Sequence, residues 1–296
     1  PRGAPPPVVE DTPTAPHLRD TGRASAEFGR STSQRVNIPA AEIGAGLATA
    51  QIRETIIKAM SRPAEAKPWR DYRPIFIQPK RIDDGRAFLA THRAALQRAE
   101  DQSGVSKDII VAILGIETSY GGNKGSYPVI DALYTLAFAY PRSGNPERVA
   151  YEDKREAFFR DELAQLFALG KEEGLDITTL KGSYAGAMGW GQFMPSSYRQ
   201  YAVDGDGDGR RDLFNDLDDV FASVANYFAK KGKWERGGAV MQRATLLNRI
   251  LADLYGEQTL LQQGLIPPAL IYGHSGFLRA LVGAKPPRGL FLHLYA

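Results

Sequence analysis

The chain has 296 residues, of which 43% are hydrophobic and 24% are charged, a composition typical of a globular protein with a sizeable core. The formal net charge of +3 does not indicate a nucleic-acid partner, and the absence of cysteine excludes a disulfide, a thiol nucleophile and a cysteine-based zinc site. No apolar run approaches the ~20 residues needed to cross a bilayer, and because the sequence starts at Pro1 we expect a processed chain that has lost a signal.

The predicted elements are mostly helical. Residues 1–40 begin with a proline-rich stretch and lack periodicity, which predicts an extended tail. Helical spacing of apolar residues starts at about Ala41, three prolines interrupt it within 63–76, and residues 85–104 are predicted to form one helix that ends at Gly104. Further helical patterns cover residues 106–119, 128–140, 151–170 and 218–231. Strand-like alternation is scarce, so we predict a mainly α fold of the α+β class.

Glu117 is the candidate catalytic residue, in the apolar stretch VAILGIETSYG. It lies four residues after Ile113 and eight after Ile109, so on a helix capped by Ser106 it projects close to the apolar face. Burial disfavours the charged carboxylate and raises its pKa, as a general acid requires. Spacing alone leaves open that Glu117 turns to water or pairs with an arginine.

A long segment rich in glycine and aromatic residues occupies 181–204, KGSYAGAMGWGQFMPSSYRQYAVD. Its glycines permit close approach of the backbone, its aromatic rings offer flat faces, and Ser183 and Gln192 supply hydrogen bonds. This combination favours a groove that binds sugars. Tight structural packing of a glycine-rich loop is the alternative.

Several ordered motifs resemble the membrane-bound lytic transglycosylase B type of peptidoglycan enzymes. The motifs are ILGIETSYG, DALYTLAFAYPRS, FFRDELAQL, KGSYAGAMGWGQFMPSSYRQYAVDGDGDG and SVANYF, and the resemblance covers about residues 41–257. It implies a catalytic region with a lysozyme-like core, at about 72–235, and a flanking helical subdomain. Residues 258–296, which contain no acidic side chain, would form a divergent C-terminal segment.

The resemblance also implies an activity and a set of site residues. Glu117 would act first as acid and then as base in cleaving the β-1,4 bond between MurNAc and GlcNAc, leaving a 1,6-anhydromuramyl end. The residues that would line the site are Ser183, Gln192, Phe193 and Tyr227, and Tyr120, Tyr72 and Arg142 are further candidates. An apparent insertion at 143–154 would displace Arg142. A hydrolytic muramidase and a non-catalytic, calcium-stabilised scaffold that binds peptidoglycan are the alternatives.

The stretch DGDGDGRRDLFNDLDD, residues 204–219, indicates an EF-hand-like calcium loop. Asp204, Asp206 and Asp208 occupy loop positions 1, 3 and 5, but position 12 is Asn215 in place of the usual Glu. The resemblance implies a longer loop, closed by Asp218 or Asp219, in which Arg210 contributes its backbone carbonyl. We expect such an ion to be structural. An acidic turn without metal is the alternative.

The remaining expectations concern cofactors, partners and location. Calcium is the one cofactor expected, with no organic cofactor. The expected partner is the glycan strand of peptidoglycan, with no nucleic acid. Other cell-wall enzymes are further candidate partners, and a monomeric state is expected. The expected location is the periplasm of a Gram-negative bacterium, and association with the outer membrane is a further expectation.

Overall fold

The computed structural model describes residues 21–61 and 78–231. Predictions for residues 1–20, for Tyr72 and for the C-terminal segment 258–296 lie outside the described residues. None of the described helices is long and apolar enough to cross a membrane.

Helices dominate the described part of the chain, which confirms the mainly α prediction. The helices are α1 Thr21–Val36, α2 Ala40–Thr49, α3 Glu54–Ser61, α5 Pro79–Thr91, α6 Arg93–Ser103, α7 Lys107–Thr118, α8 Val129–Phe138, α9 Val149–Glu173, α10 Pro195–Tyr201 and α11 Leu217–Lys230. A short 3-10 helix, Pro146–Arg148, precedes α9. Strands β1, Tyr127–Pro128, and β2, Lys181–Gly182, pair antiparallel.

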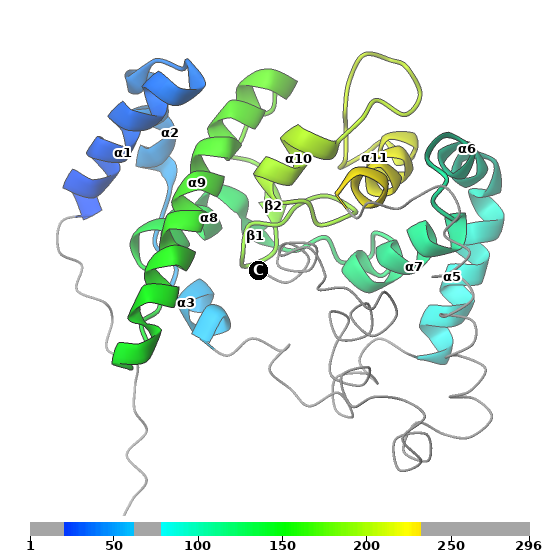
Figure 1. Ribbon diagram of the computed structural model, residues 1–296, viewed down its shortest axis with the longest axis horizontal. Helices are drawn as coiled ribbons and strands as arrows, with labels where there is room; N and C mark the ends of the chain where they lie inside the picture. Colours follow the sequence, from blue (N-terminus) through cyan, green and yellow to red (C-terminus); the bar gives the residue numbers. More distant parts are fainter. Residues whose placement is uncertain (1–20, 62–77, 232–296) are drawn as a thin grey trace, which may run out of the picture.

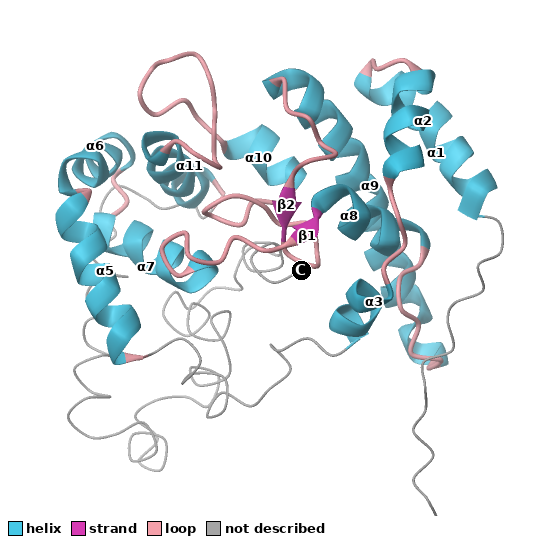
Figure 2. Cartoon of the chain, turned by 180° about the vertical axis from the view of Figure 1, so that it is seen from behind, coloured by secondary structure: helices cyan, strands magenta, loops and turns pink. Residues whose placement is uncertain are grey.

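The helices form two groups joined by the small sheet. Helices α1, α2 and α3 lie beside α8 and α9 at one end, and α5, α6, α7 and α11 lie at the other, as Figure 1 and the reverse view in Figure 2 show. The β1–β2 pair and α10 lie between them. Large side chains from both groups are fully buried, among them Ile43, Leu114, Leu133, Leu163 and Phe221.

The prediction of an extended tail up to residue 40 is wrong for residues 21–36, which form α1. Phe28 and Thr32, one turn apart, are both buried, and the Phe28 ring packs edge-on against Phe138 of α8 with centroids 5.7 Å apart. Arg35 pairs with Asp161 of α9 at 2.8 Å. The helix is therefore stabilised by distant segments, whereas its own sequence has a weak apolar pattern.

Two predicted helical stretches are each divided in the structure. The stretch 85–104 is interrupted at His92, between α5 and α6, although its predicted end is confirmed because Gly104 adopts a left-handed conformation with φ 75°. The pattern that starts at Ala41 is divided between α2 and α3. Asp131 of α8 accepts hydrogen bonds there from the backbone N–H of Gln51 at 2.9 Å and from Nε of Arg53 at 2.7 Å.

Candidate active site

Glu117 lies in the last turn of α7. As predicted, the helix begins after Ser106, whose hydroxyl accepts a hydrogen bond from the backbone N–H of Asp108 at 3.3 Å. Ile113 and Glu117 are one turn apart and share a face of α7. The Glu117 side chain is half-buried, and desolvation raises the pKa of its carboxyl well above the ordinary value, the direction that the sequence predicted.

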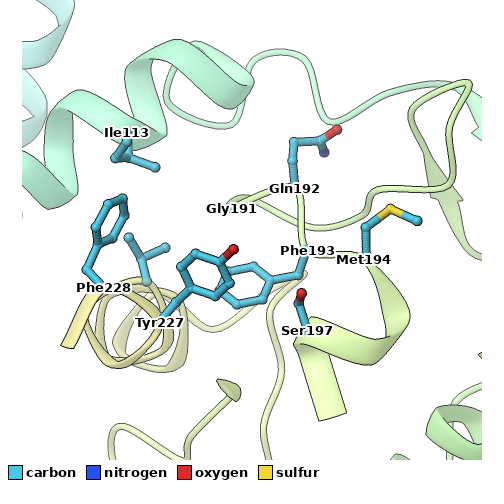
Figure 3. A pocket seen from close by; sticks show the side chains of 9 residues that line it. Ile113, Gly191, Gln192, Phe193, Met194, Ser197, Tyr227 and Phe228 are labelled. Carbon is cyan, nitrogen blue, oxygen red and sulfur yellow. The ribbon is translucent and has the colours of Figure 1, made fainter. Parts of the chain in front are cut away.

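A small pocket opens beside this face of α7 (Figure 3). Its volume is about 20 Å³, enough for roughly one water molecule. The lining residues come from α7, from the glycine-rich segment with α10, and from α11: Ile113, Gly191, Gln192, Phe193, Met194, Ser197, Val224, Tyr227 and Phe228. The structure thus brings Gln192, Phe193 and Tyr227, three of the predicted site residues, to one place.

Tyr227 presents a buried hydroxyl that has no hydrogen-bond partner among the described residues. Desolvation raises its pKa to about 12, and the nearby Tyr201 and Glu117 add to the shift. The ring packs edge-on against Phe193, with centroids 5.7 Å apart. A buried polar group without a partner is rare in proteins, so this hydroxyl is placed to bind something that enters the pocket.

Gln192 is held in an unusual conformation at the edge of the pocket. Its φ is +50°, and its side-chain amide donates to the carbonyl oxygens of Gly189 at 3.0 Å and Lys124 at 3.3 Å. These bonds fix the side chain before any ligand arrives.

Ser183 serves the local fold of the glycine-rich segment. Its hydroxyl accepts hydrogen bonds from the backbone N–H groups of Ala185, at 3.2 Å, and Ala187, at 3.1 Å. Next to it, a Cβ on Gly182 would meet the Ala187 carbonyl oxygen at 2.2 Å. The tight packing that the sequence left as an alternative is therefore present, together with the pocket.

Tyr120 and Arg142 do not line this pocket. The Tyr120 hydroxyl donates to the carbonyl oxygen of Arg81 at 3.1 Å, and its ring stacks on Phe88 between α5 and α7. Arg142 pairs with Asp153 at 2.7 Å and with Glu156, both on α9.

Thr118 is a residue that the sequence analysis missed. It follows Glu117, is 1% exposed, and its hydroxyl donates to the carbonyl oxygen of Trp190 at 3.1 Å. The hydroxyl oxygen of Thr118 also accepts a hydrogen bond from the backbone N–H of Gly121 at 3.0 Å. A hydroxyl at the buried end of an otherwise apolar helix was the available signal, but its partner lies 72 residues away.

The acidic loop gathers three carboxylates. Asp204, Asp206 and Asp219 each offer an oxygen, and these oxygens lie within 4.8 Å of one another. Asp219, 1% exposed, accepts hydrogen bonds from the backbone N–H groups of Gly205 at 2.7 Å and Asp212 at 2.6 Å, yet desolvation still raises its pKa. Three hard oxygen donors, two from the loop and one from the first turn of α11, fit a calcium ion in their chemistry.

Of the two residues predicted to close this loop, Asp219 joins the cluster and Asp218 does not. Asp218 instead pairs with Arg98 of α6 at 2.5 Å. Asp208 accepts a hydrogen bond from the backbone N–H of Arg210 at 2.8 Å and is not among the three clustered residues. Gly209 has φ +90°, which agrees with the sharp turn that the sequence predicts there.

Comparison with known proteins identifies similar chains. A family model described as "Transglycosylase SLT domain" matches residues 21–266. The chain is also similar to the membrane-bound lytic murein transglycosylase B of Escherichia coli (strain K12), with 40% identity over 239 residues that cover 79% of this chain. The chain spans 62% of the length of that relative.

Solved structures of similar proteins agree with this match. The soluble lytic transglycosylase SltB1 from Pseudomonas aeruginosa is 43% identical with a TM-score of 0.62, over 71% of this chain and 67% of that one. The Escherichia coli lytic transglycosylase Slt35, in complex with calcium, is 36% identical with a TM-score of 0.60, over 70% and 62%. SltB3 from Pseudomonas aeruginosa, in complex with NAG-NAM-pentapeptide, is 31% identical with a TM-score of 0.62, over 72% and 54%.

Proposed function

Because the chain belongs to the transglycosylase SLT domain family, we propose that it cleaves the β-1,4 bond between MurNAc and GlcNAc in peptidoglycan as a lytic transglycosylase. The observation that carries this proposal is the half-buried carboxyl of Glu117, whose pKa is raised by desolvation. Glu117 lies one helical turn after Ile113 of the pocket and is close enough to Tyr227, also of the pocket, to raise the pKa of that hydroxyl. The proposed catalytic core is lysozyme-like.

In the proposed reaction Glu117 acts twice. Its carboxyl protonates the glycosidic oxygen, and the bond between that oxygen and C1 of the muramyl residue breaks. The substrate's 2-acetamido group stabilises the positive charge at C1. The Glu117 carboxylate then takes the proton of the C6 hydroxyl, whose oxygen bonds to C1 and closes the 1,6-anhydro ring. No water is consumed, and one carboxyl serves both steps, in contrast to the pair of carboxylates in most glycosidases.

The pocket, with room for roughly one water molecule, would receive a single hydroxyl or other small group of the sugar beside the reacting bond. Phe193 offers a flat ring, Gln192 an amide whose orientation is already fixed, and Tyr227 a hydroxyl without a partner in residues 21–61 and 78–231. Preorganised groups of this kind need no rearrangement when the transition state forms. Ser183 would act indirectly, through the turn that it braces.

A calcium ion would occupy the acidic loop, held by Asp204, Asp206 and Asp219 with the Arg210 carbonyl as a further ligand. Such an ion would supply positive charge between the carboxylates of the loop and that of Asp219 at the start of α11, the helix that carries Tyr227. It would take no part in the reaction. The complex of Slt35 with calcium supports this assignment.

The proposed substrate also gives the location. Murein lies in the periplasm, so the chain would act there in a Gram-negative bacterium, as a monomer, with association to the outer membrane and to other cell-wall enzymes as further proposals. The name of the membrane-bound relative and the sugar-peptide complex of SltB3 support this location and this substrate.

Product analysis on purified peptidoglycan tests the proposal. The wild type should release muropeptides with anhydro ends, lighter by one water than those with reducing ends, and Glu117→Gln should release neither. Reducing ends alone would identify a hydrolytic muramidase. An inactive wild type that binds glycan strands would identify a non-catalytic scaffold.

A further inference from the structure

The hydroxyl of Thr118 joins three parts of the candidate active site. Within α7 it lies 3.3 Å from the carbonyl oxygen of Leu114. It accepts from the backbone N–H of Gly121 in the turn that follows α7 and donates to the carbonyl oxygen of Trp190 in the glycine-rich segment. Trp190 immediately precedes Gly191, the first residue of that segment to line the pocket. A single buried oxygen thus ties the end of α7 to the pocket wall.

The turn after α7 needs such a contact, because its backbone is strained. Ser119 and Tyr120 have φ of +50° and +57°, a region that residues other than glycine adopt at a cost of roughly 1–2 kcal/mol each. Gly121 continues the run with φ +83° and packs against the Trp190 ring, which a Cβ at this position would meet at 2.3 Å. The turn keeps its shape only if the surrounding structure holds it.

The Trp190 side of this contact is itself fixed. The indole N–H donates to the carbonyl oxygen of Phe214 at 3.1 Å, and the backbone N–H donates to that of Leu213 at 3.1 Å. The Thr118 hydroxyl therefore bonds to an anchored carbonyl. If this bond were lost, the end of α7, where Glu117 lies, would move and Trp190 would stay in place.

We propose that Thr118 is a positioning residue, whose hydroxyl sets the place of the Glu117 carboxyl relative to the pocket residues Gln192 and Phe193. This inference rests on the proposed function, because it assigns a role to Thr118 in the reaction of Glu117. Thr118 itself does not touch the substrate. A displacement of about 1 Å in a reacting group lowers a rate by as much as roughly 100-fold, whereas binding of a long glycan by other residues is little affected.

The test compares two variants of Thr118 with a matched control. Thr118→Val keeps the shape and removes the hydroxyl, and Thr118→Ser keeps the hydroxyl. Thr135→Val is the control: Thr135 is also buried, on α8, and its hydroxyl bonds to the backbone of Gln51 and Arg53 in the other helix group. Loss of the Thr135 hydroxyl removes a similar set of hydrogen bonds, and Thr135 does not line the pocket.

Initial rates of glycan cleavage would give kcat and KM for each variant, and thermal melting would give its stability. We expect kcat of Thr118→Val to fall by roughly 10- to 100-fold with little change in KM, and Thr118→Ser to recover most of it. Thr135→Val should lose a comparable amount of stability and keep the wild-type kcat.

Two outcomes would overturn the inference even if the wild type is active and its activity depends on Glu117. One is a Thr118→Val enzyme with wild-type kcat. The other is a Thr135→Val enzyme that loses as much kcat as Thr118→Val when the two variants have the same Tm. An inactive wild type is a different result, since it would overturn the proposed function and, with it, the role assigned to Thr118.

Discussion

Glu162 of α9 accepts hydrogen bonds from both the backbone N–H and the hydroxyl of Ser196, at 2.9 Å and 2.5 Å. Ser196 lies in the first turn of α10, between Met194 and Ser197 of the pocket. A carboxylate that is 2% exposed therefore anchors one wall of the candidate active site to the long helix α9.

Burial makes this anchor sensitive to pH. Desolvation raises the pKa of Glu162 to about 7, although the two bonds from Ser196 lower it. Between the unfolded value of about 4.3 and 7, the folded protein holds more protons than the unfolded chain, so the free energy of unfolding falls as pH rises through this window. The effect is on the order of 3 kcal/mol. Urea unfolding at pH 4.5 and 7.5 should show this loss in the wild type relative to Glu162→Gln.

Glu152, also buried on α9, is the matched control. Burial alone would raise its pKa, but hydrogen bonds from Ser143 and the charges of Arg142 and Arg148 lower it below the ordinary value. Relative to Glu152→Gln, the wild type should therefore lose stability as pH falls through the folded pKa, the opposite direction. If stability relative to Glu162→Gln and stability relative to Glu152→Gln changed in the same direction with pH, the opposite pKa shifts assigned to Glu162 and Glu152 would be contradicted.

Replacement of Glu117 by glutamine should remove activity without unfolding the protein. Loss of a general acid and base lowers kcat by roughly 10²- to 10⁴-fold, while loss of a buried ionisable group leaves stability at neutral pH equal or higher. Because Glu117 must hold a proton to act as the acid, the wild-type kcat/KM should fall on the alkaline side, as pH rises through its raised pKa. Asp108→Asn, an exposed acidic residue at the other end of α7, should retain the wild-type rate, and a comparable loss there would count against Glu117.

Local patterns in the sequence predicted the features that depend on nearby residues. The raised pKa of Glu117 was predicted from its spacing after Ile109 and Ile113, although these residues are only half-buried and the fully buried face of α7 carries Ile110, Leu114 and Thr118. Gly104 ends its helix as predicted. The alternating Asp204 and Asp206 indicated the acidic loop.

Features that depend on distant contacts could not be predicted. Helix α1 is held by Phe138 and Asp161, more than a hundred residues further along the chain. Asp218 and Asp219 are neighbours with the same side chain, but their contacts differ. Asp218 pairs with Arg98, which is 120 residues away in the sequence. The role of Thr118 likewise depends on Trp190.

Tyr227 and Tyr198 provide a test of the pocket. The Tyr227 hydroxyl has no protein partner in the described structure, so Tyr227→Phe removes no bond and should leave the free energy of unfolding unchanged or slightly higher. If this hydroxyl binds the glycan, KM should rise or kcat fall by roughly 10-fold, the value of one hydrogen bond. Kinetics on purified glycan strands and urea unfolding together measure both effects.

The Tyr198 hydroxyl, in contrast, donates to the carbonyl oxygen of Arg211 and accepts from the backbone N–H of Leu213 at 3.1 Å. Tyr198→Phe should therefore cost about 1–3 kcal/mol of stability and leave KM at the wild-type value. A Tyr227→Phe enzyme that is destabilised but kinetically normal would assign Tyr227 to the core instead of the pocket.

Substitutions of Asp219 and Asp218 distinguish a calcium site from an acidic turn without metal. If Asp204, Asp206 and Asp219 bind calcium, the ion should raise Tm, because a ligand at 100 times its Kd adds about 2.7 kcal/mol to the free energy of unfolding. Asp219→Asn should abolish this calcium-dependent rise. Asp218→Asn makes the same change of charge one residue earlier, breaks an ion pair with Arg98 of small value, and should keep the rise. A wild-type Tm that is equal in calcium and in chelator would contradict the site, whereas a rise abolished equally by both substitutions would place Asp218 among the ligands and require the Arg98 pair to break on binding.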